Sequence, residues 1–161
     1  KQMELEQQLG ILALQFLIAS LCVTPLRRYA GINLLKFRRA FGLLGFGYIC
    51  LHLLTWLALD MVFLWSQIVE DITERPYIMV GMAAFLLLVP LALTSTKGWI
   101  RRLGPRWQKL HRLVYLAVPL GAVHFVMQER VWTAQLITYL VLAFGIVGIR
   151  MIWIRRRRVA R

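Results

Sequence analysis

The sequence predicts an all-α integral membrane protein, a helical bundle with five transmembrane helices in a single domain over residues 1–161. Of the 161 residues, 60% are hydrophobic, which is more than one soluble core of this size can bury. These residues come in near-continuous runs of about 20, the length that an α-helix needs to cross a bilayer. The charged residues lie mostly between the runs and are sorted by sign. Lipid must therefore cover much of the apolar surface.

Five apolar runs are long enough to span a membrane. In lipid the backbone has to satisfy its own hydrogen bonds, so each run is expected to be a helix. The second run is over-long and contains Asp60. We therefore expect its span to end there and residues 61–72 to form an amphipathic helix at the membrane surface. No repeat or linker divides the chain. The runs cover residues 9–26, 41–64, 77–94, 107–127 and 132–154.

Basic residues gather at one end of the expected helices and acidic residues at the other. Three clusters hold 17 of the 20 lysines and arginines, whereas all seven acidic residues lie at the opposite helix ends. The positive-inside rule then makes the basic loops and the C-terminus cytoplasmic. Their retention near anionic lipid explains the net charge of +13 without a nucleic-acid partner. The clusters are Arg27, Arg28, Lys36, Arg38 and Arg39; Lys97, Arg101, Arg102, Arg106, Lys109 and Arg112; and Arg150, Arg155, Arg156, Arg157, Arg158 and Arg161.

This orientation places the N-terminus outside. An outer N-terminus without a signal sequence is unusual for a bacterial membrane protein. One further helix ahead of Lys1 would remove the difficulty, so we expect a six-helix parent.

The two cysteines and three aromatic residues near the ends of the spans are expected to have structural roles. Cys22 and Cys50 lie inside apolar runs without CxxC spacing, so we interpret them as packing residues. Trp65, Tyr77 and Trp132 fall at the outer ends of the spans and are expected to anchor the helices at the membrane interface.

The three histidines are the strongest candidates for function, because ionisable residues within spans are costly to bury. His52 and His124 lie about 20 and 26 Å along helices that run in the same direction, so their imidazoles are expected to face each other at similar height. Such a pair is typical of the two axial ligands of a b-type haem held inside a helical bundle. Glycines expected to let a flat macrocycle approach are Gly42, Gly45, Gly47 and Gly121.

His111 lies about 20 Å from His124, near the basic end, and indicates a second haem or a flavin entry site. Arg38 is the candidate partner at that level, since it falls within about 40° of the face that carries His52. Arginine stays protonated, so contact with a haem propionate is favoured over iron ligation. A straight helix would set His111 and His124 about 140° apart, and a kink at Pro119 is expected to turn both towards one channel.

The alternative is a cofactor-free membrane scaffold or transporter whose histidines only form hydrogen bonds between helices. Paired buried carboxylates and broken helices in both halves, which are typical of transporters, are missing from the sequence. An optical spectrum of the purified protein separates the two hypotheses.

Five segments carry a resemblance to a known family: VTPLRRY at residues 23–29, FRRAFGLLGF at 37–46, LHLLTW at 51–56, TERPYIMVG at 73–81 and LALTSTKGWIRRLGPRWQKLHRLVYL at 91–116. The last is long and specific. Over nearly its whole length the chain resembles the MsrQ (YedZ) family, the haem-binding membrane subunits of the periplasmic methionine sulfoxide reductase system, in the ferric-reductase-like transmembrane group.

The resemblance implies a six-helix protein of the bacterial inner membrane that binds haem b, with flavin mononucleotide (FMN) as a further cofactor. Such a subunit passes electrons to a periplasmic molybdenum-containing subunit that reduces methionine sulfoxide, and is not itself the catalytic subunit. His52, His111 and His124 match the family's histidines. The family's first helix is lacking, and the fourth histidine of the wider group corresponds to a position near Arg38, which leaves the number of haems open.

No GxGxxG signature for nucleotide binding is present in the sequence. The chain is therefore not expected to take hydride from a nicotinamide itself. We expect its electrons to come from a membrane quinol or from a separate cytoplasmic flavin reductase.

Overall fold

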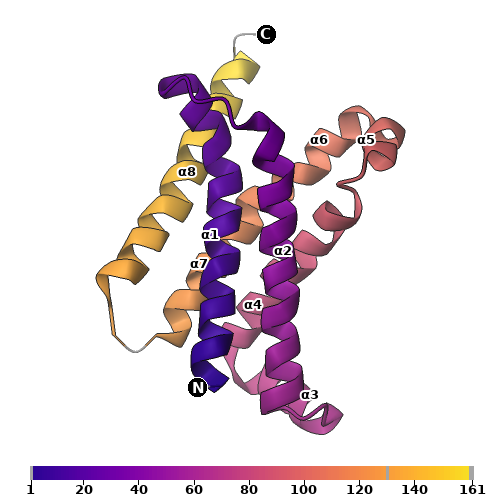
Figure 1. Ribbon diagram of the computed structural model, residues 1–161, viewed down its shortest axis with the longest axis vertical. Helices are drawn as coiled ribbons and strands as arrows, with labels where there is room; N and C mark the ends of the chain where they lie inside the picture. The colour runs from indigo at the N-terminus through magenta and orange to yellow at the C-terminus, as the bar shows by residue number, and fades with distance from the viewer. Residues whose placement is uncertain (1, 130, 160–161) are drawn as a thin grey trace.

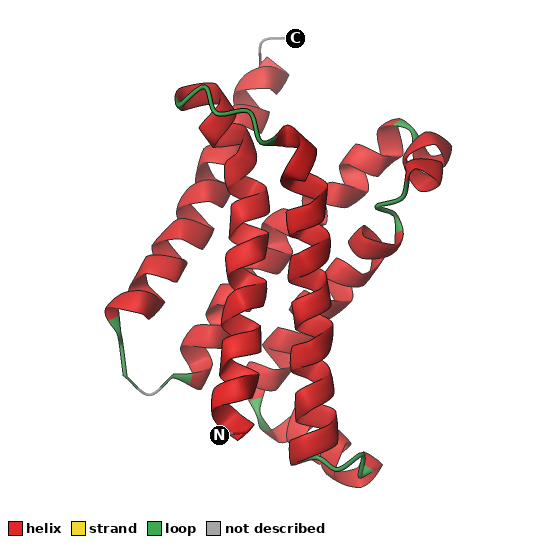
Figure 2. Ribbon diagram, viewed as in Figure 1, coloured by secondary structure: helices red, strands yellow, loops and turns green. Residues whose placement is uncertain are grey.

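The computed structural model confirms the all-α membrane bundle, and it describes residues 2–129 and 131–159 (Figure 1). Within these residues Figure 2 shows helices joined by short loops and no strand. Lys1, Arg130 and Arg161 lie outside the described residues. The helices are α1 (Gln2–Tyr29), α2 (Arg38–Thr55), α3 (Trp65–Glu74), α4 (Pro76–Leu93), α5 (Lys97–Leu103), α6 (Pro105–Leu110), α7 (Val114–Gln128) and α8 (Ala134–Val159), with short turns η1 (Leu35–Phe37), η2 (Trp56–Asp60) and η3 (His111–Leu113).

Five helical segments of the described chain are long and apolar enough to cross a membrane, as predicted, so the chain is a multi-pass membrane protein. Their bounds agree with the apolar runs but extend further into polar sequence, because a helix continues beyond the hydrocarbon that it crosses. The segments are Met3–Tyr29, Leu35–Asp60, Pro76–Leu93, Pro105–Gln128 and Ala134–Arg156.

The two ends of the bundle differ in charge. At the top of Figure 1 lie the α1–α2 loop, α5, α6 and the last turns of α8. These segments and the helix ends next to them carry the described arginines and lysines of the three clusters. We call this the basic end. The opposite end holds the first turn of α1, the helix α3 and the α7–α8 loop, and we call it the acidic end. Successive spans therefore run in opposite directions between the two ends, as the charge pattern predicts.

The amphipathic helix predicted after the second span is present as α3, but it begins at Trp65 rather than Met61. A wide turn ends the second span first, in which the main-chain N–H of Met61 donates to the carbonyl of Trp56 at 3.0 Å. Val62 and Phe63 then adopt positive φ angles of 46° and 55°. Residues 61–64, which the sequence pattern assigned to the start of the amphipathic helix, therefore form this turn instead.

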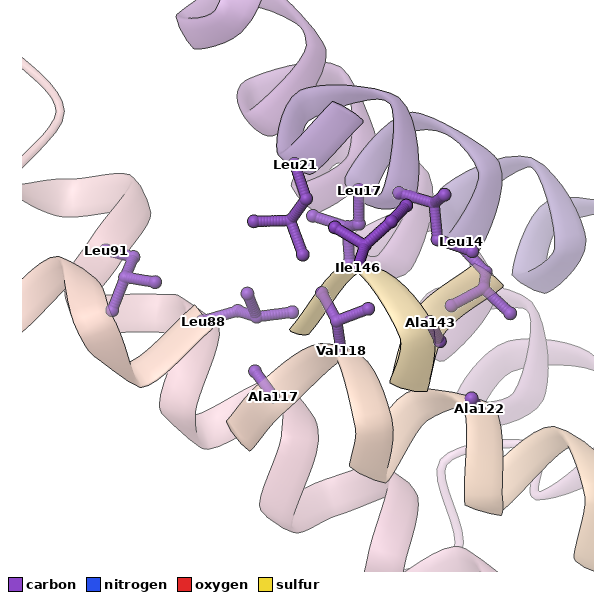
Figure 3. Close-up of a cluster of buried hydrophobic side chains, with 11 residues drawn as sticks. Leu14, Leu17, Leu21, Leu88, Leu91, Ala117, Val118, Ala122, Ala143 and Ile146 are labelled. Carbon is purple, nitrogen blue, oxygen red and sulfur yellow. The ribbon is translucent and has the colours of Figure 1, made fainter. Parts of the chain in front are cut away.

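Side chains from α1, α4, α7 and α8 form the main core (Figure 3). Its small members, Ala117 and Ala122 on α7 and Ala143 on α8, are at most 1% exposed and let these helices pack closely. Large apolar side chains such as Leu86, Leu116 and Val141 are instead exposed on the outside of the bundle, as expected where lipid is the solvent. Leu14, Leu17, Ile18, Leu21, Leu88, Leu91, Val118 and Ile146 complete the core.

The aromatic residues expected at the membrane interface and the cysteines expected to pack inside the bundle differ in their exposure. Trp65 and Trp132 are 74% and 67% exposed, as side chains at an interface would be. Tyr77 is only partly exposed and borders an internal cavity. Cys22 and Cys50 are free and partly buried, and Cys22 packs against the core.

The close pairing of α1 and α2 depends on Gly45. A Cβ atom at this position would lie 2.9 Å from Leu17 Cγ and 3.2 Å from the carbonyl oxygen of Ala13. We expect Gly45→Ala to lower the free energy of unfolding by about 1–3 kcal/mol, because the two helices must move apart. Titration with a denaturing detergent, followed by circular dichroism, measures this. Gly47→Ala is the matched control on α2, since nothing lies within 4 Å of its added Cβ; equal stability of the two variants would contradict the expectation.

Candidate functional site

The described residues line a cavity towards each end of the bundle. The acidic-end cavity has a volume of about 480 Å³ and contains His52 and His124. The basic-end cavity has a volume of about 540 Å³ and contains His111 and Arg38. Leu17 and Leu88 border both cavities.

In the acidic-end cavity the structure brings together the two histidines that sequence spacing predicted to meet. His52 comes from α2 and His124 from α7, and their ring centres are 6.2 Å apart with the ring planes at 73°. Residues 72 positions apart in the chain thus present two imidazoles to one space.

Each of these imidazoles is held by the backbone of a neighbouring helix. His52 Nδ1 lies 2.9 Å from the carbonyl oxygen of Glu6 on α1, and His124 Nδ1 lies 2.7 Å from that of Tyr77 on α4. A carbonyl only accepts, so Nδ1 carries the proton in both rings. The lone pair is then on Nε2, which is the nitrogen and the tautomer that a metal ligand needs.

A glycine four residues after each accepting carbonyl makes room for the ring. The pairs are Glu6 with Gly10 and Tyr77 with Gly81, and in an α-helix residue i+4 lies beside the carbonyl of residue i. A Cβ on Gly81 would lie 2.8 Å from His124 Nδ1, and one on Gly10 would lie 3.4 Å from His52 Nδ1. Only the absence of a side chain lets the His124 ring reach the Tyr77 carbonyl.

The residues present fit a haem better than a bare metal ion. Within the described residues no group of three or more histidine, cysteine or acidic side chains is placed to hold a metal. A haem brings four in-plane nitrogens of its own and needs only two axial ligands. Two imidazoles bound on opposite sides of one iron, with bonds of about 2 Å, have ring centres about 6 Å apart, which agrees with the observed spacing. Most of the remaining lining is apolar, as around a porphyrin face.

His111 lies in the basic-end cavity together with Arg38, apart from the other two histidines. Its Nε2 is 3.1 Å from Thr94 Oγ1, and that hydroxyl donates to the Pro90 carbonyl at 2.6 Å. Because the hydroxyl has a single proton, His111 Nε2 must be the donor to Thr94, and its lone pair is on Nδ1. The Trp107 ring stacks on the imidazole, with ring centres 3.9 Å apart. His111 is therefore held in a different tautomer from His52 and His124.

The sequence predicted that a kink at Pro119 would turn His111 and His124 towards one channel, but the structure places them in separate cavities. Helix α7 runs unbroken through Pro119, from Val114 to Gln128. The departure from α-helical geometry is the 3-10 turn η3 at His111–Leu113, where α6 passes into α7. A 3-10 turn advances about 120° per residue instead of 100°, which changes the angle between His111 and His124. The two histidines still open into separate cavities.

The glycines named from the sequence differ from those that make room for the histidines. Gly121 borders the acidic-end cavity, whereas Gly45 packs against α1 and Gly42 borders the basic-end cavity. Gly47 has nothing within 4 Å of its added Cβ. The glycines that make room for the histidine rings, Gly10 and Gly81, are on helices that carry neither His52 nor His124. Proximity along the chain could not reveal them.

Comparisons with known proteins agree with the geometry. The family described as ferric reductase like transmembrane component matches residues 8–122. The chain is 50% identical over 149 residues to the protein-methionine-sulfoxide reductase heme-binding subunit MsrQ of Rhizobium meliloti (strain 1021), covering 92% of this chain and 69% of the relative. It is 47% identical over 148 residues to the proteins of the same name from Brucella anthropi and Brucella ovis, covering 92% of this chain and 66% of each relative.

The chain thus spans about two thirds of the length of the relatives that it matches. The family match covers more than half of the chain and includes His52 and His111, and it ends two residues before His124. The alignments with the relatives are longer and include 92% of the chain. The chain belongs to the ferric reductase like transmembrane family and, within it, to the MsrQ heme-binding subunits.

Proposed function

We propose that this protein is a membrane b-type cytochrome subunit that binds haem between His52 and His124 and passes electrons across the membrane. The observation that supports this most directly is the pair of imidazoles 6.2 Å apart, each with its Nδ1 proton held by a backbone carbonyl. Bound haem supplies a one-electron carrier. The chain's own residues fix the ligand tautomer, hold the rings at one level and surround them with apolar side chains that keep water away.

The two-sided charge of the bundle supports an orientation in the membrane, and with it an outward direction of electron flow. With the basic end and the C-terminus in the cytoplasm of a bacterium, the His52 and His124 cavity lies towards the periplasmic side of the inner membrane. Electrons would enter at the basic end from a cytoplasmic flavin reductase or a membrane quinol. They would leave for a periplasmic, molybdenum-containing catalytic subunit that reduces methionine sulfoxide. The names of the relatives, protein-methionine-sulfoxide reductase heme-binding subunits, support a methionine sulfoxide reductase as the electron acceptor.

The optical spectrum of the purified full chain tests the proposal. Protein expressed with ample haem precursor should show a low-spin b-type spectrum that sharpens on reduction with dithionite. A colourless, well-folded preparation would instead favour the cofactor-free scaffold, in which the histidines only join helices.

His111 and Arg38 are proposed to serve a second redox group, a haem or FMN, in the basic-end cavity. We expect His111→Ala to remove electron entry, or about half of the haem, while the spectrum from the acidic-end cavity is retained. Haem content and the rate of reduction by an added flavin reductase with NADH measure this. Lys109→Ala is the matched control, since that side chain is exposed and does not border the cavity. Unchanged haem content together with an unchanged reduction rate in His111→Ala would rule out the role.

A further inference from the structure

Arg150 is a buried cation whose hydrogen bonds are incomplete. It lies on α8, is 8% exposed and borders the basic-end cavity. One of its terminal nitrogens, Nη2, donates to the carbonyl oxygen of Leu21 at 3.1 Å, but Nε is buried and has no hydrogen-bond partner. The guanidinium carbon is also 5.8 Å from the centre of the Trp153 ring. A carbonyl and an aromatic face neutralise only part of a buried charge.

Among the described residues, no aspartate or glutamate side chain borders the cavity at this end of the bundle, whereas three further arginines do so. All seven acidic residues of the sequence lie at the other end of the spans. A buried charge is normally paired, and an unpaired one is strongly destabilising. An anionic group of another molecule would supply the negative charge that balances Arg150. The three other arginines are Arg38, Arg39 and Arg112.

The shape and chemistry of the cavity indicate what that molecule is. Its volume of about 540 Å³ is similar to that of the cavity proposed to hold haem. Apolar side chains such as Phe46 and Leu91 line part of the wall, and the stacked rings of Trp107 and His111 line another. This combination suits a flat, largely apolar molecule with a negatively charged group, which the planar fork of an arginine can bind through two hydrogen bonds.

We propose that Arg150, together with Arg38, binds the oxyanion of a planar redox cofactor seated in the basic-end cavity. The oxyanion is a carboxylate or a phosphate, carried by the propionates of a second haem or by FMN. Arg150 is then the residue that holds the charged end of this cofactor, while Trp107 and His111 lie against its ring. The inference rests on the proposed function, because it requires a second redox group beside the haem of the acidic-end cavity.

The experiment uses the full chain in nanodiscs of phosphatidylcholine, a lipid without net charge. Haem is measured as the pyridine haemochrome, FMN by fluorescence after denaturation, and residual phosphatidylglycerol by mass spectrometry. Wild-type protein should retain one equivalent of haem or FMN beyond the haem ligated by His52 and His124. After the cofactors are removed, titration with haemin or with FMN gives the affinity, and inorganic phosphate in competition tests whether a free anion suffices. Haemin binding and FMN binding distinguish the two sources of the oxyanion.

We expect Arg150→Gln to weaken binding of the second cofactor by about tenfold or more, because a charge-assisted pair of hydrogen bonds is lost. Arg150→Lys should retain part of the affinity, since it keeps the charge without the fork. Arg155→Gln, an exposed residue on the same helix that does not border the cavity, should bind like wild type. The spectrum from the acidic-end cavity should be unchanged in all three variants.

Three results would overturn the inference. Arg150→Gln could bind the second cofactor with wild-type affinity, or wild-type protein could contain no second cofactor. Wild-type protein could also retain the anionic lipid phosphatidylglycerol, and no second cofactor, in the cavity. If Arg150→Gln does not fold, Arg150→Lys decides the question, because wild-type affinity in that variant would contradict a role for the guanidinium fork. Failure of the proposed function is recognised separately, because wild-type protein would then lack the low-spin spectrum from His52 and His124 altogether.

Discussion

Replacing His124 with alanine is expected to abolish the low-spin b-type spectrum of the acidic-end cavity, and His52→Ala should do the same. Each variant removes one of the two Nε2 atoms proposed to bind iron, and the cavity offers no other histidine as a substitute. The measurement is the reduced-minus-oxidised difference spectrum with haem quantified per protein. Retention of a low-spin spectrum at wild-type haem content in both variants would end the proposal.

Two controls separate ligation from a purely structural role. Met127→Ala removes an exposed side chain from the same helix and should leave the spectrum unchanged. In His124→Gly, added imidazole can occupy the space of the lost ring, so it should restore low-spin haem. A histidine that only linked α7 to the carbonyl of Tyr77 would show a change in stability, but imidazole would not restore a haem spectrum.

Gly81→Ala is expected to lower haem affinity by about 10–100-fold without removing any ligand, which is typical of losing the partner that orients a metal-binding histidine. The new Cβ would lie 2.8 Å from His124 Nδ1, so the ring must turn away and its bond to the Tyr77 carbonyl must break. Haem titration of the apoprotein gives the affinity, and the spin state and reduction potential show whether the axial ligand has been displaced.

The glycines of the bundle provide a graded series of controls for this effect. Gly10→Ala should have a smaller effect, because its Cβ would make contact with His52 at 3.4 Å, an ordinary van der Waals distance. Gly145→Ala should have none, since nothing lies within 4 Å of its added Cβ. If all three variants lose haem equally, general destabilisation of the helices, rather than the position of the imidazole, would be the cause.

The sequence could predict those features that follow from long-range averages of polarity or from spacing on one helix. The apolar runs indicated the five spans, and helical rise placed His52 and His124 at one level, where the structure also brings their rings together. Hydrophobic periodicity also predicted α3, but it could not anticipate the left-handed backbone at Val62 and Phe63 that delays its start.

Features that depend on contact between helices were not predictable from the sequence. Gly10 and Gly81 make room for the histidines from helices on which no histidine lies. In a single sequence, the spacing of a glycine four residues after an accepting residue is too common to be informative by itself. Arg150 was grouped with the other basic residues of the C-terminus, because burial of its guanidinium depends on α1 packing against α8.

Leu17 and Leu88 border both cavities, so branched aliphatic side chains form part of the layer between the two spaces. Such a layer is a poor conductor for protons and hydrated ions, which need a continuous chain of polar groups or water. An electron needs neither, because it can tunnel through saturated carbon over short distances. In the proposed electron-transfer role, this layer would let electrons pass between the two redox sites while giving protons and ions no path across the bilayer.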